Sequence, residues 1–308
     1  MKGKVIRSTG SFYQVFVDGE IITARLSGKM RLDALKHTNP VAVGDEVSLG
    51  EPEGQDPMWR ILEVMERKNY LIRKATNLSK QTHILAANVD QIFIVASLFH
   101  PRTSTGFIDR ILVSAQAYGI PACILLNKKD LLSEEEWEEV AYWQAGYEKA
   151  GYPLMVLSAF DTEDLHTLQD MVGHKTTLFT GHSGAGKSTL LNHLEPGLGL
   201  RTGELSQKHG KGTHTTTFAE MFPLTNGGWV IDTPGIKEFG LHGMSDAELP
   251  DYFPEFFALK GQCKFANCVH FNEPGCAVIK ALEDGELMPE RYANYLQMRE
   301  SNQDGYRR

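Results

Sequence analysis

Residues 181–188 read Gly-His-Ser-Gly-Ala-Gly-Lys-Ser and constrain the possible fold more than any other feature of this chain. The segment follows TTLFT, an apolar run typical of a buried strand, and precedes KSTLLNHLE, which has the pattern of a helix. In a strand–loop–helix setting the glycines let backbone N–H groups converge on phosphate oxygens. Lys187 would reach the outer phosphates, and the Ser188 hydroxyl would bind Mg²⁺. A purely structural glycine turn is the alternative, and the flanking strand and helix disfavour it.

From about residue 90 onward, strand-like segments alternate with helical ones. The apolar runs DQIFIVASLF, PACILLNKKD and YPLMVLSAF are separated by TGFIDRILVSAQAYG and SEEEWEEVAYWQAGYEKAG. Ser133 opens the second of these helices, and acidic residues fill its first turn, as the helix dipole favours. This alternation predicts an α/β domain with a parallel sheet covered by helices on both faces.

A second phosphate-side loop, Asp232-Thr233-Pro234-Gly235, follows the apolar run GGWVI. An Asp at the end of a neighbouring strand can hold Mg²⁺ through water, and Gly235 can offer its N–H to a γ-phosphate. On its own this pattern is weak evidence for a nucleotide site, but in a chain that also has a phosphate-binding loop it is strong evidence.

Between the two phosphate loops lies KGTHTTT, in which Thr215 or Thr216 is placed to close over Mg²⁺ as a switch threonine. The residue after Gly235 is Ile236, whose side chain cannot orient water, so we expect slow intrinsic hydrolysis. His214 is our candidate for positioning the attacking water. A solvent-exposed histidine without a catalytic role is the alternative.

The base-recognition signal is Asn127-Lys128-Lys129-Asp130, which ends the strand CILLN. A carboxylate at this point accepts hydrogen bonds from both N1–H and the 2-amino group of guanine. Adenine lacks that amine, so it would leave the carboxylate unpaired. Ser158-Ala159-Phe160, after the next strand, can offer a backbone N–H to the guanine O6. These loops favour GTP over ATP, whereas an ordinary polar loop would be a plausible interpretation of the first one alone.

The base-recognition loops precede the phosphate loops along the chain, which is the reverse of their order in Ras-like GTPases. Parallel α/β domains tolerate such a circular permutation because their termini and loops lie at the surface. The loop after Gly235 therefore leads directly into the C-terminal segment, and we hypothesise that the nucleotide state is transmitted covalently to it.

The N-terminal segment reads as short β-strands with turn signals, including KVIRSTGSFYQVFVDGEIITARL, VAVGDEVSLG and MWRILEVMERKN. Several strands in about 70 residues predict a small barrel of the OB type, with a β-rich interaction module of another topology as the alternative. A basic cluster within it suits a nucleic-acid platform, although such clusters are more often solvated faces; it contains Arg25, Lys29, Arg31, Lys36 and His37.

The C-terminal segment holds three of the four cysteines. Cys263, Cys268, His270 and Cys276 fit a tetrahedral Cys₃His zinc site with a structural role, because no ligand position is left open. Free thiols, or a disulfide formed under oxidising conditions, are the alternative. Cys123 lies inside an apolar strand and is interpreted as a core residue.

Composition narrows the class of protein. The 308 residues carry a formal net charge of -8, which argues against nonspecific polyanion binding by the whole surface. Residues 1–74 are slightly basic and residues 260–308 are neutral, so nucleic-acid contact through the two ends remains open. No run approaches the ~20 apolar residues of a membrane span, and no secretory signal is evident. We expect a soluble, monomeric cytoplasmic protein with three domains, 1–74, 75–244 and 245–308.

The permuted order of NKKD, SAF, GHSGAGKS, GTHTTT and DTPG resembles the circularly permuted GTPases. The β-rich N-terminus and the C-x(4)-C-x-H-x(5)-C tail make the chain similar to the ribosome small-subunit-dependent GTPase A (RsgA) family. The resemblance implies an OB-type RNA-binding domain, a circularly permuted P-loop GTPase domain and a mostly helical zinc-binding domain. It also implies GTP/GDP with Mg²⁺ and one structural zinc as cofactors, and the 30S subunit with its 16S rRNA, along with other 30S assembly factors, as partners.

The predicted nucleotide ligands come from the loops described above. They are Asn127, Lys128, Lys129, Asp130, Ser158, Ala159, Gly181, His182, Ser183, Gly184, Ala185, Gly186, Lys187, Ser188, Thr189, Asp232 and Gly235. The predicted catalytic group comprises Lys187, His214, Thr215 and Thr216.

Three functions compete. The first is a GTPase stimulated by the small subunit and acting late in 30S maturation. The second is a GTP-gated RNA-binding module with negligible turnover. The third is an ATP-dependent P-loop enzyme acting on a small molecule, which the loop at Asp130 disfavours.

Overall fold

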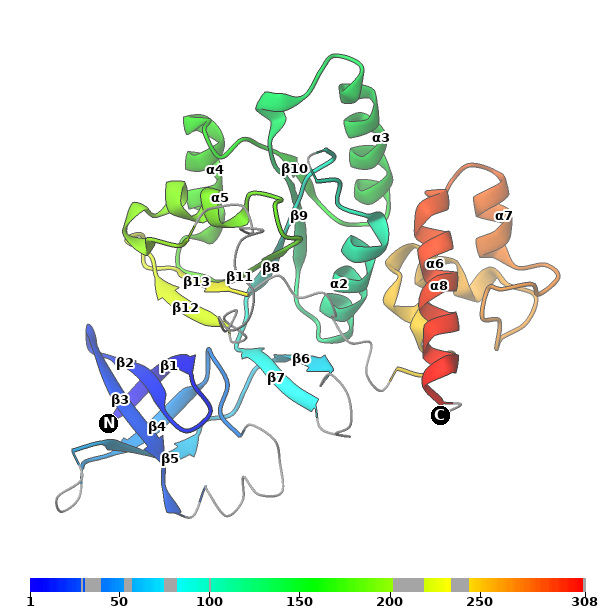
Figure 1. Ribbon diagram of the computed structural model, residues 1–308. Coiled ribbons are helices and arrows are strands. Elements are labelled where there is room, and N and C mark those ends of the chain that lie inside the picture. The colour runs from blue at the N-terminus through cyan, green and yellow to red at the C-terminus, as the bar shows by residue number, and fades with distance from the viewer. Residues whose placement is uncertain are drawn as a thin grey trace, which may run out of the picture.

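The computed structural model describes most of the chain (Figure 1): residues 1–28, 30, 40–52, 57–74, 82–99, 101–201, 219–233 and 244–306. Along these residues a strand-rich N-terminal part is followed by alternating strands and helices and then by a helical C-terminal part.

A closed five-stranded barrel forms the N-terminal part. Its strands are β1 (Lys2–Ser8), β2 (Tyr13–Val17), β3 (Glu20–Leu26), β4 (Glu46–Gly50) and β5 (Trp59–Val64). Each strand pairs with two others of the set: β1 with β2 and β4, β3 with β2 and β5, and β4 with β5. Alternate residues point inward, so that Tyr13, Val15 and Val17 of β2 are buried while the residues between them are half-exposed. The predicted barrel is therefore confirmed.

A two-stranded sheet follows the barrel, formed by β6 (Tyr70–Lys74) and β7 (Thr82–Ala87). The barrel contacts it closely at Gly44, which has a φ of +89°; a Cβ there would lie 2.1 Å from the Ala87 carbonyl oxygen. Ala87 N–H donates to the Val43 carbonyl (2.8 Å). Only glycine permits this approach, because any other residue would force the two backbones apart.

The central sheet has the order β10-β9-β8-β11-β13-β12, with β12 antiparallel to its neighbour and the other five strands parallel. Its strands are β8 (Gln91–Ala96), β9 (Ala122–Leu126), β10 (Leu154–Val156), β11 (Thr176–Gly181), β12 (Glu220–Pro223) and β13 (Trp229–Asp232). The helices that cover it are α2 (Thr105–Ala117), α3 (Glu136–Lys149), α4 (Thr162–Val172) and α5 (Lys187–Leu194).

Side-chain alternation along β8 divides the core of this domain into two layers. Ile92 and Ile94 pack with residues of α2 and α3. Phe93 and Val95, which point the other way, pack with residues of α4 and α5. The predicted parallel sheet with helices on both faces is thus present.

The barrel and the central sheet are joined at one edge. β1 pairs antiparallel with β12 at Arg7 and Glu220, which makes a continuous sheet of 11 strands through the barrel and the central domain. The Phe16 ring also meets the Trp229 ring edge-on at 5.1 Å between centroids.

Helices dominate the C-terminal part. They are η3 (Leu249–Tyr252), α6 (Pro254–Leu259), η4 (Lys260–Gln262), α7 (Ala277–Glu283) and α8 (Pro289–Tyr306). Their shared core includes Phe253, Phe256 and Tyr295, and Val113 of α2 belongs to the same cluster. Figure 1 shows α8 beside α2. In the part of the chain that the structure describes, no helix combines the length and the apolar character needed to cross a membrane.

Candidate nucleotide and metal sites

The phosphate-binding loop connects β11 to α5, as the sequence predicts. Gly181 lies against β8, where a Cβ would come 2.5 Å from the Val95 carbonyl oxygen. Gly186 has a φ of +90°, and a Cβ there would lie 2.4 Å from Asn127 Nδ2. Only residues without a side chain fit these two positions. The loop can therefore present its N–H groups to an anion at the start of α5.

Side chains of the base-recognition loop hold the phosphate loop in place. Asn127 Nδ2 donates to the Ala185 carbonyl (3.0 Å), and Lys128 Nζ donates to the Gly184 carbonyl (2.7 Å). Burial lowers the pKa of Lys128, and the charge of Asp130 partly opposes that shift. These contacts bring together two loops that are more than 50 residues apart, the one predicted to bind the base and the one predicted to bind phosphates.

Asp130 lies in the short helix η1 (Lys129–Leu131) and is oriented by its neighbours. Ser158 Oγ donates to Asp130 Oδ1 (2.5 Å) and accepts from the Phe160 N–H (3.2 Å). The Ser158 N–H in turn donates to Asp164 Oδ2 (2.7 Å). One carboxylate oxygen is thereby fixed, and the arrangement suits a carboxylate that accepts hydrogen bonds from a base edge.

Lys129 is predicted as a nucleotide ligand, but in the structure its ammonium group forms ion pairs with two acidic side chains. Its Nζ lies 2.9 Å from Asp161 Oδ2 and 2.7 Å from Asp164 Oδ2. Hydrogen bonds to Asp164 and Asp161 raise the pKa of Lys129. The side chain therefore ties η1 to the start of α4.

On the phosphate side, Lys187 forms an ion pair with Asp232 at the end of β13. Ser188 and Thr189 lie in the first turn of α5, half-buried, and His182 and Ser183 are exposed in the loop before it. Ser188 and Asp232 carry oxygen donors of the kind that Mg²⁺ prefers, and that ion needs few protein ligands because it retains several waters. The donor set therefore fits a nucleoside triphosphate with its magnesium ion.

Of the remaining predicted residues of this site, Ala159 is buried and four lie outside the described part of the chain. These four are His214, Thr215, Thr216 and Gly235.

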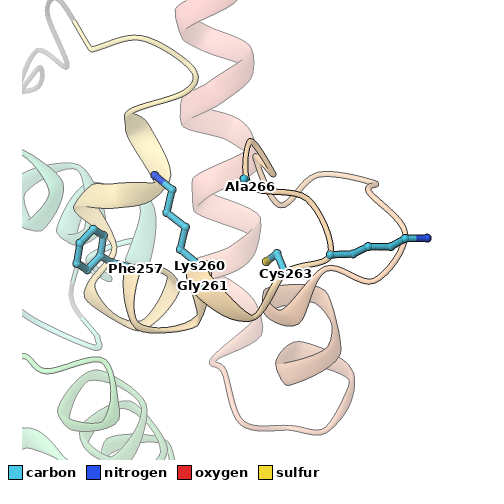
Figure 2. Close-up of a pocket in the computed structure, with 6 residues that line it drawn as sticks. Phe257, Lys260, Gly261, Cys263 and Ala266 are labelled. Carbon is cyan, nitrogen blue, oxygen red and sulfur yellow. The ribbon is translucent and has the colours of Figure 1, made fainter.

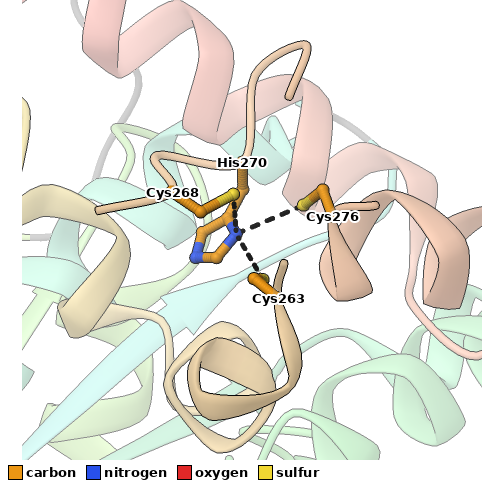
Figure 3. A group of neighbouring side chains, drawn as sticks. All are labelled: Cys263, Cys268, His270 and Cys276. Carbon is orange, nitrogen blue, oxygen red and sulfur yellow. Dashed lines mark hydrogen bonds between the residues drawn. The ribbon is translucent and has the colours of Figure 1, made fainter. Parts of the chain in front are cut away.

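The predicted zinc ligands converge in the C-terminal part (Figure 3). Cys263 follows η4, Cys276 precedes α7, and Cys268 and His270 lie in the loop between them. His270 Nδ1 is 3.6, 3.4 and 3.3 Å from the sulfurs of Cys263, Cys268 and Cys276. A tetrahedral zinc with bonds of about 2.3 Å to sulfur and about 2.0 Å to nitrogen requires edges of about 3.5 Å, so the four side chains fit that ion.

No sequence pattern predicts a role for Glu273, whose side chain organises the loop that carries two of these ligands. Its carboxylate accepts from the N–H groups of Val269 (3.0 Å), Phe271 (2.8 Å) and Asn272 (3.2 Å). Partial burial favours a higher pKa for Glu273, but these hydrogen bonds outweigh it and lower the pKa to about 2. A glutamate in a polar loop gives no sequence signal for this role.

A surface cavity of about 520 Å³ lies beside the cysteine cluster (Figure 2). It is lined by Phe257, Lys260, Gly261, Cys263, Lys264 and Ala266. Cys263 is the half-buried member of the cluster, whereas the other three predicted ligands are buried. Solvent thus reaches the cluster from the Cys263 side, and four protein ligands leave no open position for catalysis.

Solved structures share this fold over nearly the whole chain. YjeQ from Thermotoga maritima is 32% identical, with a TM-score of 0.76 over 97% of each chain. YloQ, described as a circularly permuted GTPase, is 29% identical, with a TM-score of 0.71 over 98% of this chain and 95% of its own. Fold and loop order define a circularly permuted P-loop GTPase, an enzyme that hydrolyses GTP, and the predicted fold class is confirmed.

The RsgA GTPase family model matches residues 64–242 and the RsgA N-terminal domain model matches residues 2–56, so the chain belongs to the RsgA family. Relatives with the name small ribosomal subunit biogenesis GTPase RsgA cover its full length. The Christiangramia forsetii protein is 50% identical over 309 residues, spanning 100% of this chain and 98% of the relative. The Bacteroides fragilis protein is 48% identical over 306 residues, spanning 99% and 98%.

Proposed function

We propose that this GTPase acts on the small ribosomal subunit, binds 16S rRNA, and serves a late step of 30S maturation. The observation that carries the proposal is the full-length similarity to relatives named for small-subunit biogenesis, at 50% and 48% identity. Such identity spans the barrel, the GTPase domain and the cysteine cluster together, so a shared partner is a simpler explanation than a shared nucleotide site alone.

Within this proposal each part of the chain has its own task. Residues 1–74 bind RNA, residues 75–244 bind and hydrolyse GTP, and residues 245–308 are stabilised by zinc. The nucleotide is held by the loops at Asn127–Asp130, Ser158, residues 181–189 and Asp232, whose contacts are described above. Nucleotide binding would then change how the flanking parts engage RNA.

Hydrolysis itself requires a group that positions water. Ile236 stands where Ras-like enzymes carry a glutamine, and an apolar side chain cannot do this. We therefore assign slow hydrolysis to the free protein and stimulation to the 30S particle, with His214 positioning the water and Thr215 or Thr216 closing over Mg²⁺.

GTP turnover measured with 30S subunits, with 50S subunits and with neither tests the proposal, and ATP serves as the substrate control. We expect stimulation by 30S subunits alone. Equal rates under all three conditions would contradict stimulation by the small subunit and so this first candidate function. His214→Ala should reduce the stimulated rate and retain GTP binding; an unchanged stimulated rate would remove His214 from the mechanism.

The same isoleucine favours a second candidate, a GTP-gated RNA-binding module in which turnover is negligible. Nucleotide-dependent binding to 30S subunits, combined with turnover that stays slow when they are bound, would select this function over the first.

A further inference from the structure

The start of α2 touches the phosphate-binding loop. Pro101, just before the helix, lies so close to Gly184 that a Cβ on that glycine would come 2.8 Å from Pro101 Cδ. Within the helix, the Phe107 ring meets the His182 ring edge-on at 5.9 Å between centroids. The first turn of α2, and the segment that leads into it, therefore both contact the phosphate-binding loop.

The first two turns of α2 also contact α8. Asp109 is fully buried, with Oδ1 accepting from Arg291 Nη1 (2.6 Å) and Oδ2 accepting from Asn294 Nδ2 (2.6 Å). Asn294 also lies against Gly106, where a Cβ would come 3.2 Å from its Oδ1. Both carboxylate oxygens of Asp109 are thus fixed by residues one turn apart on the C-terminal helix.

Arg291 is the centre of this contact. It is 1% exposed and also binds Glu255 of α6, with Nε 2.5 Å from Oε1 and Nη2 3.1 Å from Oε2. Its guanidinium lies within 5.0–5.7 Å of the rings of Phe253, Tyr152 and Tyr147. A single buried cation therefore joins α2 of the GTPase domain, α6 and α8.

Holding the helices together does not by itself explain why this cluster is built from charged side chains. Removing two carboxylates and a guanidinium from water costs about as much as their attraction returns, and apolar side chains would hold the helices together at least as well. What buried charges add is a fixed geometry, because each hydrogen bond allows one register of α8 on α2.

We propose that Arg291 is a positioning residue for the nucleotide site: through Asp109 and the first turns of α2 it fixes the phosphate-binding loop and couples it to the C-terminal helical part. The proposal rests on the assignment of residues 181–188 as the nucleotide site and is independent of the ribosomal role. Coupling between binding sites is reciprocal, so a partner bound to the C-terminal part changes nucleotide affinity by the same factor as nucleotide changes partner affinity.

Gly106→Ala is the mildest test, because it retains every charged and hydrogen-bonding group. The added methyl would lie 3.2 Å from Asn294 Oδ1, so the Asn294 side chain, which binds Asp109, must give way by a few tenths of an ångström. Alanine is also the better helix former, so α2 itself would not fray. Gly197→Ala is the matched control, since a Cβ at Gly197 meets no atom within 4 Å.

Arg291→Lys is the stronger test: it retains the charge but loses the planar group that reaches Asp109 and Glu255 together. Lys280→Met is its control, because Lys280 is exposed and its ion pair with Asp284 lies within one turn of the chain on α7. Gly106→Ala decides the question even if Arg291→Lys does not fold.

The readouts are the GDP dissociation constant, kcat and KM for GTP, zinc content and the amide hydrogen exchange of α8 with and without GDP. We expect GDP to bind at least about fivefold more weakly in both variants, in the range of known site-to-site coupling, with zinc content unchanged. GDP should also slow exchange in α8 of the unsubstituted protein and do so less in the variants.

A lowered thermal midpoint with unchanged GDP affinity and turnover would overturn the proposal, because a merely structural clamp predicts that pattern. Failure of the unsubstituted chain to bind GDP would overturn the nucleotide-site assignment and the coupling with it. Normal binding there, with unaffected variants, would overturn the coupling alone.

Discussion

We expect discrimination between guanine and other bases to depend on how Asp130 is held. Ser158 Oγ occupies one of its oxygens, and the carboxylate has acceptors only, so it matches the two donors of guanine. Asp130→Asn replaces one acceptor with a donor, which suits a base with a carbonyl in place of the 2-amino group. We expect GTP affinity to fall by about 100-fold, since hydrogen bonds to charged groups contribute about 1.5–3 kcal/mol each, and affinity for XTP to rise.

Titration with fluorescent GTP and XTP analogues measures both affinities. Asp170→Asn, an exposed acid on α4, is the control and should change neither. Equal loss of GTP and XTP binding in Asp130→Asn would mean that Asp130 supports the loop rather than reading the base.

Zinc affinity at the Cys₃His cluster should depend on Glu273. Its carboxylate holds the N–H groups of Val269, Phe271 and Asn272, and with a pKa of about 2 it is charged at neutral pH. Glu273→Gln retains the shape but weakens these hydrogen bonds, so we expect about 10- to 100-fold weaker zinc binding, as for other outer-sphere changes. Competition with a chelator measures it, and Glu283→Gln is the exposed control. Zinc affinity equal to that of the control would contradict the role.

Residues with a local chemical signature could be predicted from the sequence, and residues defined by a distant partner could not. The four metal-binding candidates and the phosphate loop are each contained within 14 residues or fewer, and both form as expected. Asp109 and Arg291 lie in helical segments and belong to no motif that the sequence shows. Their burial depends on a contact between residues 182 positions apart, which no periodicity encodes.

At the scale of elements, the strand–loop–helix unit from β11 to α5 depends on Gly186. A Cβ there would lie 2.4 Å from Asn127 Nδ2, and the positive φ costs an L residue about 1–2 kcal/mol. Gly186→Ala should therefore separate the phosphate loop from the base-recognition loop and abolish detectable GTP binding. Gly197→Ala, at an open position, should bind GTP normally. Calorimetric titration with GTP compares them, and near-normal binding by Gly186→Ala would show that the loop can reshape at little cost.

Strand and helix types in the central domain followed from hydrophobic pattern, because β8 and β9 are buried on both faces and their sequences are almost continuously apolar. The pairing of β1 with β12 could not be predicted from that pattern. Strand edges carry no side-chain signal for a partner, since backbone groups of any sequence can pair. Arg7 and Glu220, which meet at this edge, are more than 200 residues apart and have no shared pattern.

For the molecule as a whole, this edge joins the barrel to β12, which pairs in turn with β13, the strand that ends at Asp232. On the other side, α8 packs on α2 through Asp109 and Arg291. The central domain is therefore contacted by both flanking parts, by the barrel through β12 and by the C-terminal part through α2.

Aromatic packing, rather than the ion pair, should contribute most of the stability of the junction between the barrel and the central sheet. Arg7 and Glu220 are 3.4 Å apart with side chains 41% and 32% exposed, a kind of pair that contributes about 0–1 kcal/mol. Phe16 meets Trp229 edge-on, and Lys4 Nζ lies 5.2 Å from the centre of the same ring, with burial lowering the pKa of Lys4. The ring pair contributes about 0.5–1.5 kcal/mol beyond the area it buries.

Phe16→Ala should therefore release the barrel from the central sheet, while Glu220→Gln should leave it docked. Phe16 lies on the outer face of β2, so its loss spares the barrel core. Spin labels at the exposed positions Asp18 and Glu163, introduced as Asp18→Cys and Glu163→Cys, report the distance between the two parts. We expect a broad distribution of distances for Phe16→Ala and a narrow one for Glu220→Gln and for the protein without either substitution. A broad distribution for Glu220→Gln alone would reverse the ranking and assign the junction to its ion pair.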